Sequence, residues 1–77
     1  MSSRVDHTLD LRGSVEPITL LKVTQAFRDM QPNEILEILG RDADTKKNLF
    51  KVLQSFSFDL ILMEEADAAY RIQLKKR

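Results

Sequence analysis

The stretch LDLRGSVEPITLLK, from Leu9 to Lys22, contains the end of one secondary-structure element and the start of the next. In residues 7–12 the leucines alternate with polar residues, which is the period of a β-strand with one buried face. Gly13 interrupts this alternation. Pro17 suits the first position of a helix, because its missing N–H would have no partner there. The stretch therefore predicts a strand over 7–12 and a helix that begins at Pro17.

Two helices are predicted from apolar residues spaced three and four positions apart. The first helix runs from Pro17 to the break at Pro32-Asn33, and the second covers about 45–56 after a capping Asp42 or Asp44. The predicted buried stripes are Leu20, Val23, Phe27 and Met30 in the first helix, and Leu49, Val52, Leu53 and Phe56 in the second.

Three further strands are predicted in the rest of the chain, over 34–40, 58–64 and 69–75. The segment 58–64 (FDLILME) is apolar at nearly every position, which predicts a strand in the interior of the sheet. The segment 69–75 alternates cleanly, with Tyr70, Ile72 and Leu74 on its apolar side. The element order is therefore βαβαββ.

This order predicts an α/β (α+β) fold of the two-layer sandwich type. Strands separated by helices run parallel with right-handed crossovers, and the last two strands form an antiparallel hairpin. Two helices cover only one face of a four-stranded mixed sheet, so the other face is left open. We expect one domain over 1–77, with a loose N-terminus at 1–5.

Composition and charge exclude several classes of function. Twelve basic and twelve acidic residues give no net charge, so no net field attracts nucleic acid or an anionic membrane. The chain contains no cysteine and a single histidine, His7, so we predict neither a metal nor another cofactor. No apolar run approaches the roughly 20 residues of a membrane span, and the first residues do not resemble a signal peptide. We expect a cytoplasmic protein.

Several segments resemble one known family in the same order along the chain. Leu9–Gly13 matches a strand of the form LDxxG, Pro17 matches the first proline of a Cys-Pro-x-Pro sequence, and Leu20-Leu21 match the aliphatic pair behind it. This pattern resembles the TusA family, also called SirA-like, which consists of small sulfur carriers with the order βαβαββ. The resemblance extends without gaps over 6–76.

The chain departs from this pattern at the positions around the family's reactive cysteine. Glu16 stands at the cysteine position, and Thr19 replaces the second proline. The resemblance implies that the family's cysteine carries sulfur as a persulfide and passes it to a partner. A carboxylate has no such chemistry, so we expect this chain to have no catalytic residue and not to carry sulfur. A negative charge at a helix N-terminus is stabilising, so Glu16 is either a mimic of the charged cysteine or a tolerated change.

Three functions follow from this interpretation. The first is a protein-binding or regulatory module linked to sulfur relay, with a sulfur-relay or redox protein as its partner. The second is a subunit of a sulfurtransferase system in which the partner supplies the cysteine. The third is RNA binding through the open sheet face, which the absence of net charge disfavours.

Two surfaces are candidates for partner binding. The first is the end of the molecule near the cysteine position, formed by Arg12, Glu16, Pro17, Ile18 and Leu21. For Ile18 and Leu21 the alternative is packing beneath the second helix. The second surface is the open sheet face, and it could bind a partner or a second copy of the chain. If Leu36, Ile38, Leu60 and Leu62 face the helices, the residues exposed on it are Ile35, Leu39, Ile61 and Met63. The alternative is a set of scattered apolar residues covered by charged side chains.

Overall fold

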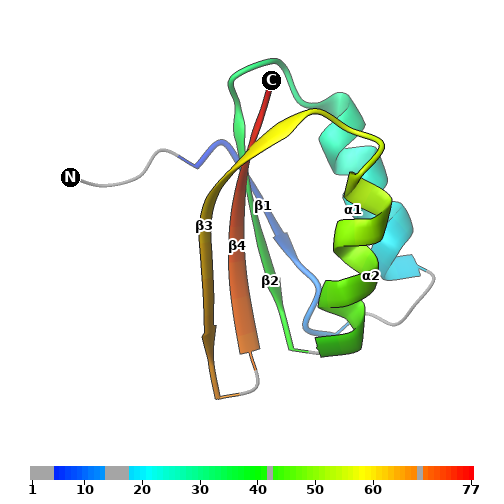
Figure 1. Ribbon diagram of the computed structural model, residues 1–77, viewed down its shortest axis with the longest axis vertical. Coiled ribbons are helices and arrows are strands. Elements are labelled where there is room, and N and C mark those ends of the chain that lie inside the picture. Colours follow the sequence, from blue (N-terminus) through cyan, green and yellow to red (C-terminus); the bar gives the residue numbers. More distant parts are fainter. Residues whose placement is uncertain (1–4, 14–17, 42, 68) are drawn as a thin grey trace.

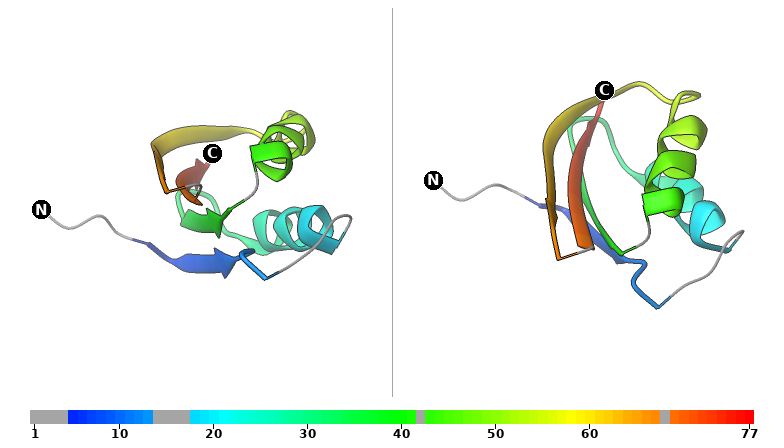
Figure 2. Two further views of the ribbon diagram at one scale, coloured as in Figure 1. Left: turned by 90° about the horizontal axis from the view of Figure 1, so that it is seen from below. Right: turned by 60° about the horizontal axis from the view of Figure 1, so that its bottom comes forward.

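The computed structural model describes residues 5–13, 18–41, 43–67 and 69–77. Its elements follow the order β1 (His7–Asp10), α1 (Ile18–Asp29), β2 (Ile35–Gly40), α2 (Ala43–Leu53), β3 (Phe58–Ala66) and β4 (Ala69–Lys76). Both helices lie side by side against one face of a four-stranded sheet (Figure 1 and Figure 2). The predicted order βαβαββ and the two-layer fold with one open sheet face are confirmed.

Several predicted features lie outside the described residues. These are the loose N-terminus over 1–4, the helix start at Pro17, the residue Glu16 and the capping residue Asp42. Of the described elements, β1 ends at Asp10, two residues earlier than the alternation predicted, and α2 ends at Leu53.

The strand order in the sheet is β1-β2-β4-β3, with β1 parallel to β2 and the other neighbours antiparallel. The prediction that the apolar segment 58–64 forms an interior strand is therefore wrong, because β3 is an edge strand. β4 takes the interior place, since its side chains Tyr70, Ile72 and Leu74 are all buried against the helices. On β3, Leu60, Ile61 and Met63 remain 45–49% exposed.

The core lies between the helices and the inward face of β2 and β4. The predicted stripe of α1 is confirmed at Val23 and Phe27, which are fully buried, while Leu20 is partly buried. From α2, Leu49 and Leu53 reach the same core. The buried apolar set is Leu11, Val23, Phe27, Met30, Leu36, Ile38, Leu49, Leu53, Tyr70, Ile72 and Leu74.

A β-bulge changes which side chains of β3 face the helices. Leu60 lies opposite Leu74, but the next paired residue, Leu62, lies opposite Gln73. Since residues directly opposite each other share a face of the sheet, Leu62 lies on the open face and Met63, opposite Ile72, lies on the helix side. Both positions are the reverse of the prediction, because the extra residue of a bulge shifts the two-residue alternation by one.

The C-terminal end of α1 is capped by a side chain from the end of β4. The ammonium group of Lys76 donates hydrogen bonds to the carbonyl oxygens of Phe27 at 2.9 Å, Arg28 at 3.2 Å and Met30 at 2.8 Å. The last carbonyls of a helix have no partner within it, and the negative end of the helix dipole favours a cation there. Lys76 thus joins the helix layer to the central strand β4.

We predict that Lys76→Met lowers the free energy of unfolding by about 1–2 kcal/mol, because the partly buried carbonyls of Phe27 and Met30 lose a charged donor while the apolar stem is kept. Urea denaturation measures the change. Lys75→Met is the matched control, since Lys75 lies opposite Ile35 and Asp59 on the other face of the sheet. Equal effects of the two substitutions would contradict the capping role.

Candidate functional site

The chain leaves β1 through a short, rigid turn held by Asp10 and Arg12. The Nε and Nη2 atoms of Arg12 donate to the two carboxylate oxygens of Asp10 at 2.9 and 2.8 Å, and the Arg12 backbone N–H donates to the same carboxylate at 3.0 Å. The guanidinium group and this N–H lower the pKa of Asp10 below its ordinary value of 3.8. Arg12 is therefore an exposed residue whose side chain is paired with Asp10.

Two large apolar side chains at the start of α1 lie in solvent. Ile18 is 53% exposed and Leu21 is 57% exposed. Residues three positions apart share one face of a helix, so the two side chains form a single apolar surface. The alternative that they pack beneath the second helix is wrong.

Three of the five residues proposed for this docking end are thus exposed: Arg12, Ile18 and Leu21. The other two, Glu16 and Pro17, lie outside the described residues. The first turn of α1 also contains Thr19, which is buried, with no hydrogen-bond partner for its hydroxyl in the described part of the chain. The burial of this polar residue was not predicted.

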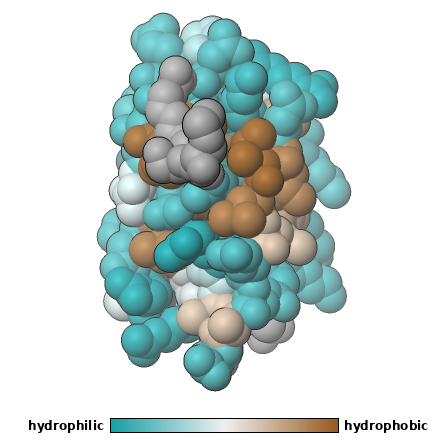
Figure 3. Space-filling view, turned by 90° about the vertical axis from the view of Figure 1, so that its left-hand side faces the viewer, coloured by the Kyte–Doolittle hydropathy of each residue, from teal (hydrophilic) through white to brown (hydrophobic). Residues whose placement is uncertain are grey.

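The open face of the sheet is divided by polar side chains. The Nε2 atom of Gln73 donates to the Glu37 carboxylate at 2.8 Å. Arg71 lies between this carboxylate and that of Glu64, at 3.7 and 3.8 Å. In Figure 3 the apolar areas of this face are accordingly separated by hydrophilic surface. The predicted Ile35 and Leu39, together with Leu62, therefore lie around a polar centre, while Ile61 is the unpaired residue of the bulge.

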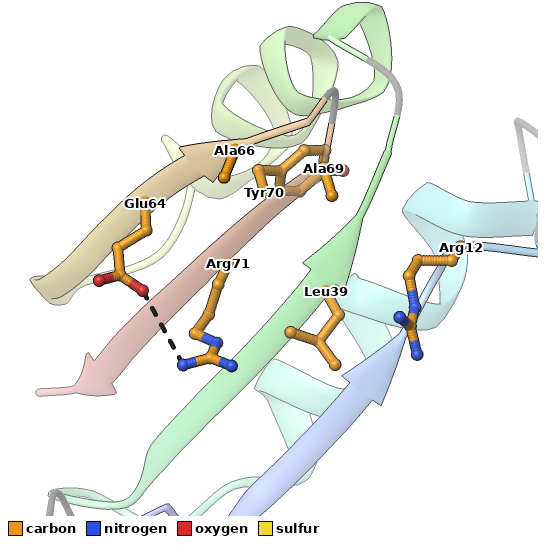
Figure 4. Close-up of a pocket in the computed structure, with 7 residues that line it drawn as sticks. All are labelled: Arg12, Leu39, Glu64, Ala66, Ala69, Tyr70 and Arg71. Carbon is orange, nitrogen blue, oxygen red and sulfur yellow. Dashed lines mark ion pairs between the residues drawn. The ribbon is translucent and has the colours of Figure 1, made fainter.

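At one end of this face a pocket opens between strands β2, β3 and β4 and the turn after β1. Its volume is about 300 Å³. Figure 4 shows Leu39 between the side chains of Arg12 and Arg71, with the alanines of the β3–β4 hairpin near Tyr70. The lining residues are Arg12, Leu39, Glu64, Ala66, Ala69, Tyr70 and Arg71. Of these only Arg12 and Leu39 were predicted site residues, because the pocket depends on a strand order that the sequence pattern does not contain.

Gly40 and Tyr70 lie opposite each other in the sheet and approach closely on its helix side. A Cβ atom at Gly40 would overlap the Tyr70 ring. Glycine at the end of β2 therefore provides the space in which the ring is buried.

The described residues contain no group of three or more His, Cys, Asp or Glu side chains that could hold a metal ion. His7 instead contacts the Glu34 carboxylate at 2.9 Å, and the Gln31 backbone N–H donates to the same oxygen at 2.8 Å. Both contacts lower the pKa of Glu34. No helix in the described ranges is long and apolar enough to cross a membrane.

Comparison with known proteins identifies the family to which the chain belongs. The family model described as sulfurtransferase TusA matches residues 7–76, and the chain belongs to this family. Over 68 residues it is 28% identical to a Methanocaldococcus jannaschii protein named "Putative sulfur carrier protein", with 88% of this chain and 91% of that one covered.

Two solved structures share the fold. The crystal structure of a SirA-like protein from Desulfitobacterium hafniense has a TM-score of 0.71 at 16% identity, and covers 91% of this chain and 96% of its own. The solution structure of a Helicobacter pylori protein has a TM-score of 0.68 at 22% identity, with the same coverage of both chains. The family and fold inferred from the sequence are therefore confirmed.

The turn at Asp10 predicts a specific loss of stability in acid. Because the folded-state pKa of Asp10 lies below its ordinary value, its bonds stabilise the fold above about pH 5, and this contribution is lost as the pH falls through 3.8 towards the folded-state value. Asp10→Asn should therefore be less stable than the wild type at pH 7, and the difference should shrink steadily as the pH falls from about 5 to about 2.

The urea midpoint measured across this pH range tests the prediction. Asp29→Asn is the control, since Asp29 is exposed on α1 and no contact in the described residues is expected to hold its carboxylate. Wild-type and Asp10→Asn curves that run parallel down to low pH would contradict the role of Asp10.

We predict that Gly40→Ala lowers the free energy of unfolding by about 1–3 kcal/mol, because the added methyl group overlaps the Tyr70 ring. Gly13→Ala is the matched control, since among the described residues a Cβ there would have no atom within 4 Å beyond its chain neighbours. Thermal unfolding measures both. A second substitution, Tyr70→Leu, should cost less stability in the Gly40→Ala background than in the wild type, and strictly additive losses would contradict the proposed overlap.

Proposed function

We propose that this chain is a TusA-family protein that binds a partner in sulfur relay without carrying sulfur itself. The observation that supports this most directly is the complete absence of cysteine from its 77 residues. In this proposal Glu16 stands where the family's motif has its persulfide-carrying cysteine. A carboxylate oxygen cannot form or release a persulfide, so the covalent step is lost while the fold that presents the position is kept.

The proposed docking surface is the end formed by Arg12, Glu16, Pro17, Ile18 and Leu21. Its support is the exposure of Ile18 and Leu21, since burying one such side chain in an interface contributes about 1.5–3 kcal/mol. Arg12 adds a guanidinium group that is already held in place by Asp10, so less conformational entropy is lost when it binds. We propose that Glu16 contributes the negative charge that the family's thiolate would have supplied.

The first test measures sulfur transfer directly. The protein is incubated with a cysteine desulfurase and ³⁵S-labelled cysteine, and the label retained on this chain is measured under non-reducing conditions. We expect none on the wild type. Glu16→Cys should accept label if the donor still docks at this end, and it controls for the assay. Stable label on the wild-type chain would refute the proposal.

The second test measures docking. Affinity for the purified desulfurase, or for a TusA-family partner protein, is measured by calorimetry with wild type, Ile18→Ser, Leu21→Ser and Glu16→Lys. We expect each variant to bind at least about tenfold more weakly. Gln54→Ser is the control, because Gln54 is polar and exposed and lies outside α1. Equal affinity of all five proteins would overturn the assignment of this surface.

If a TusA-family partner protein is added to the first assay and takes up label only when this chain is present, the partner supplies the cysteine. The protein is then a subunit of the transferase rather than a regulator, and the docking surface is unchanged. A homodimer through the open sheet face remains a separate prediction, and sedimentation at several protein concentrations tests it.

A further inference from the structure

β3 forms a long, apolar edge of the sheet. It has nine residues and, in the described part of the chain, pairs on one side only, with β4. Three of the five large apolar side chains that are exposed in the described residues lie on it: Leu60, Ile61 and Met63. Its sequence FDLILMEEA contains no lysine, arginine, proline or glycine, the residues that commonly prevent an edge strand from pairing further.

The opposite edge of the sheet has a different character. β1 has only four residues, and three of them are polar. Its one apolar residue, Leu9, is partly buried against the core. A short polar edge offers little to a further strand, whereas β3 offers both unpaired backbone and apolar side chains. Addition of a strand to this sheet is therefore expected at β3.

The bulge in β3 indicates which strand fits there. Leu60 and Met63 both lie on the helix side, with two residues between them where a regular strand has one. A regular strand, such as β4, can follow β3 only by leaving Ile61 unpaired. A second copy of β3 contains the same extra residue, so two copies can pair residue for residue.

One antiparallel register makes both faces of the two copies agree. A two-fold axis perpendicular to the sheet, between Ile61 and Leu62, places Leu60 opposite Met63 of the second copy, both on the helix side. The same axis places Asp59 opposite Glu64 of the second copy, and both of these residues lie on the open face. The apolar centre of the strand thus meets its own copy, as the self-complementary interface of a symmetric dimer requires.

The acidic residues of β3 do not oppose this pairing. Each lies beside a basic side chain of the same chain, in the pairs Asp59–Arg77, Glu64–Arg71 and Glu65–Lys46. The Arg77 guanidinium contacts Asp59 at 2.7 and 2.8 Å. Glu37 shares Arg71 with Glu64, and Lys75 lies opposite Asp59 on the same face. Where Asp59 meets Glu64 of the second copy, three carboxylates therefore lie among three cations, with no net charge.

We propose that two copies of this chain pair antiparallel through β3, so that their sheets join into one sheet of eight strands. The short polar β1 is then at both outer edges, and the assembly closes at two copies. Figure 2 shows α1 on the β1 side of the helix layer, away from β3, so the docking end stays uncovered in each copy. This inference does not depend on the proposed function, and either can fail without the other.

Sedimentation equilibrium of the full chain between about 10 µM and 1 mM tests the proposal. We expect a monomer–dimer equilibrium with a Kd of about 100 µM, because a single strand edge buries less area than a standard interface. Ile61→Lys puts two ammonium groups at the axis and should raise the Kd at least about tenfold. Ile18→Lys, the same change at an exposed position of α1, should leave it unchanged. Thermal unfolding checks that both variants fold.

Disulfide trapping tests the register, since the chain has no cysteine of its own. Leu60→Cys and Met63→Cys are prepared separately, mixed and oxidised with glutathione. Residues directly opposite each other lie within disulfide reach, so the mixture should give at least about fivefold more cross-linked dimer than either variant alone. Leu60→Cys mixed with Glu64→Cys is the control, because Glu64 is one residue out of register and on the other face.

A third variant tests the charges at the ends of the paired strands. Arg77→Gln leaves Asp59 facing Glu64 of the second copy without its guanidinium partner, and this happens twice in a symmetric dimer. We expect the Kd to rise at least about threefold. Arg28→Gln, with the same change of charge on the exposed face of α1, should leave the Kd unchanged.

Three results would overturn the proposal. The first is a monomer at 1 mM, about ten times the expected Kd. The second is a dimer that Ile61→Lys leaves intact, which would assign dimerisation to another surface such as the open sheet face. The third is equal cross-linking in the Leu60–Met63 mixture and in the Leu60–Glu64 mixture, which would indicate random collision and no fixed register.

Discussion

The antiparallel pairing of β2 with β4 is the interaction on which the rest of the structure depends. Leu36 lies opposite Leu74 and Ile38 opposite Ile72, and all four side chains are fully buried under the helices. On the reverse face the same two strands join Glu37 to Gln73. A slip of one residue would turn the polar pair into the core and the apolar pairs into solvent, so the register is strongly specified. The two remaining strands are added at the outer edges of this pair.

This central pair also sets the chemical character of both faces. On the helix side it supplies a continuous apolar surface on which Val23 and Phe27 pack. On the open side its hydrogen bond leaves Gln73 only 5% exposed and places a carboxylate beside Arg71. The open face is therefore neither a bare apolar patch nor a solvated surface. It is a polar cluster with apolar margins, and the pocket lies where that cluster reaches the end of the sheet.

Local sequence patterns predicted the helices and strands well, but predicted the order of the strands in the sheet less well. The spacing of Val23 and Phe27, and the alternation of Tyr70, Ile72 and Leu74, correctly identify the buried sides of α1 and β4. The interior position of β4 was missed because the segment 58–64 is more apolar, and apolar content alone does not distinguish an edge strand that carries half-exposed side chains. The alternation past Leu60 was misread because nothing in the local pattern marks the bulge.

The candidate site was likewise only partly predictable from the sequence. The family resemblance indicates Glu16 and its neighbours from a short continuous motif, and the exposure of Ile18 and Leu21 agrees with a docking role. The pocket could not be predicted, since Arg12, Glu64 and Arg71 come together only through the strand order. The role of Lys76 as a helix cap could not be predicted from the sequence either, because its partners at the end of α1 are far away along the chain.

The position of β4 has a consequence for the order in which the protein can fold. The last strand of the chain occupies the middle of the sheet, so until it emerges from the ribosome β3 has no neighbouring strand and β2 has one open edge. The carbonyls at the end of α1 also lack the hydrogen-bond donor that Lys76 supplies until this residue has been synthesised. Because these contacts join residues far apart in the sequence, loop-closure entropy opposes their formation. Folding is therefore expected to be completed only after β4 has been synthesised, and a truncated chain that lacks β4 would expose both β2 and β3 to aggregation.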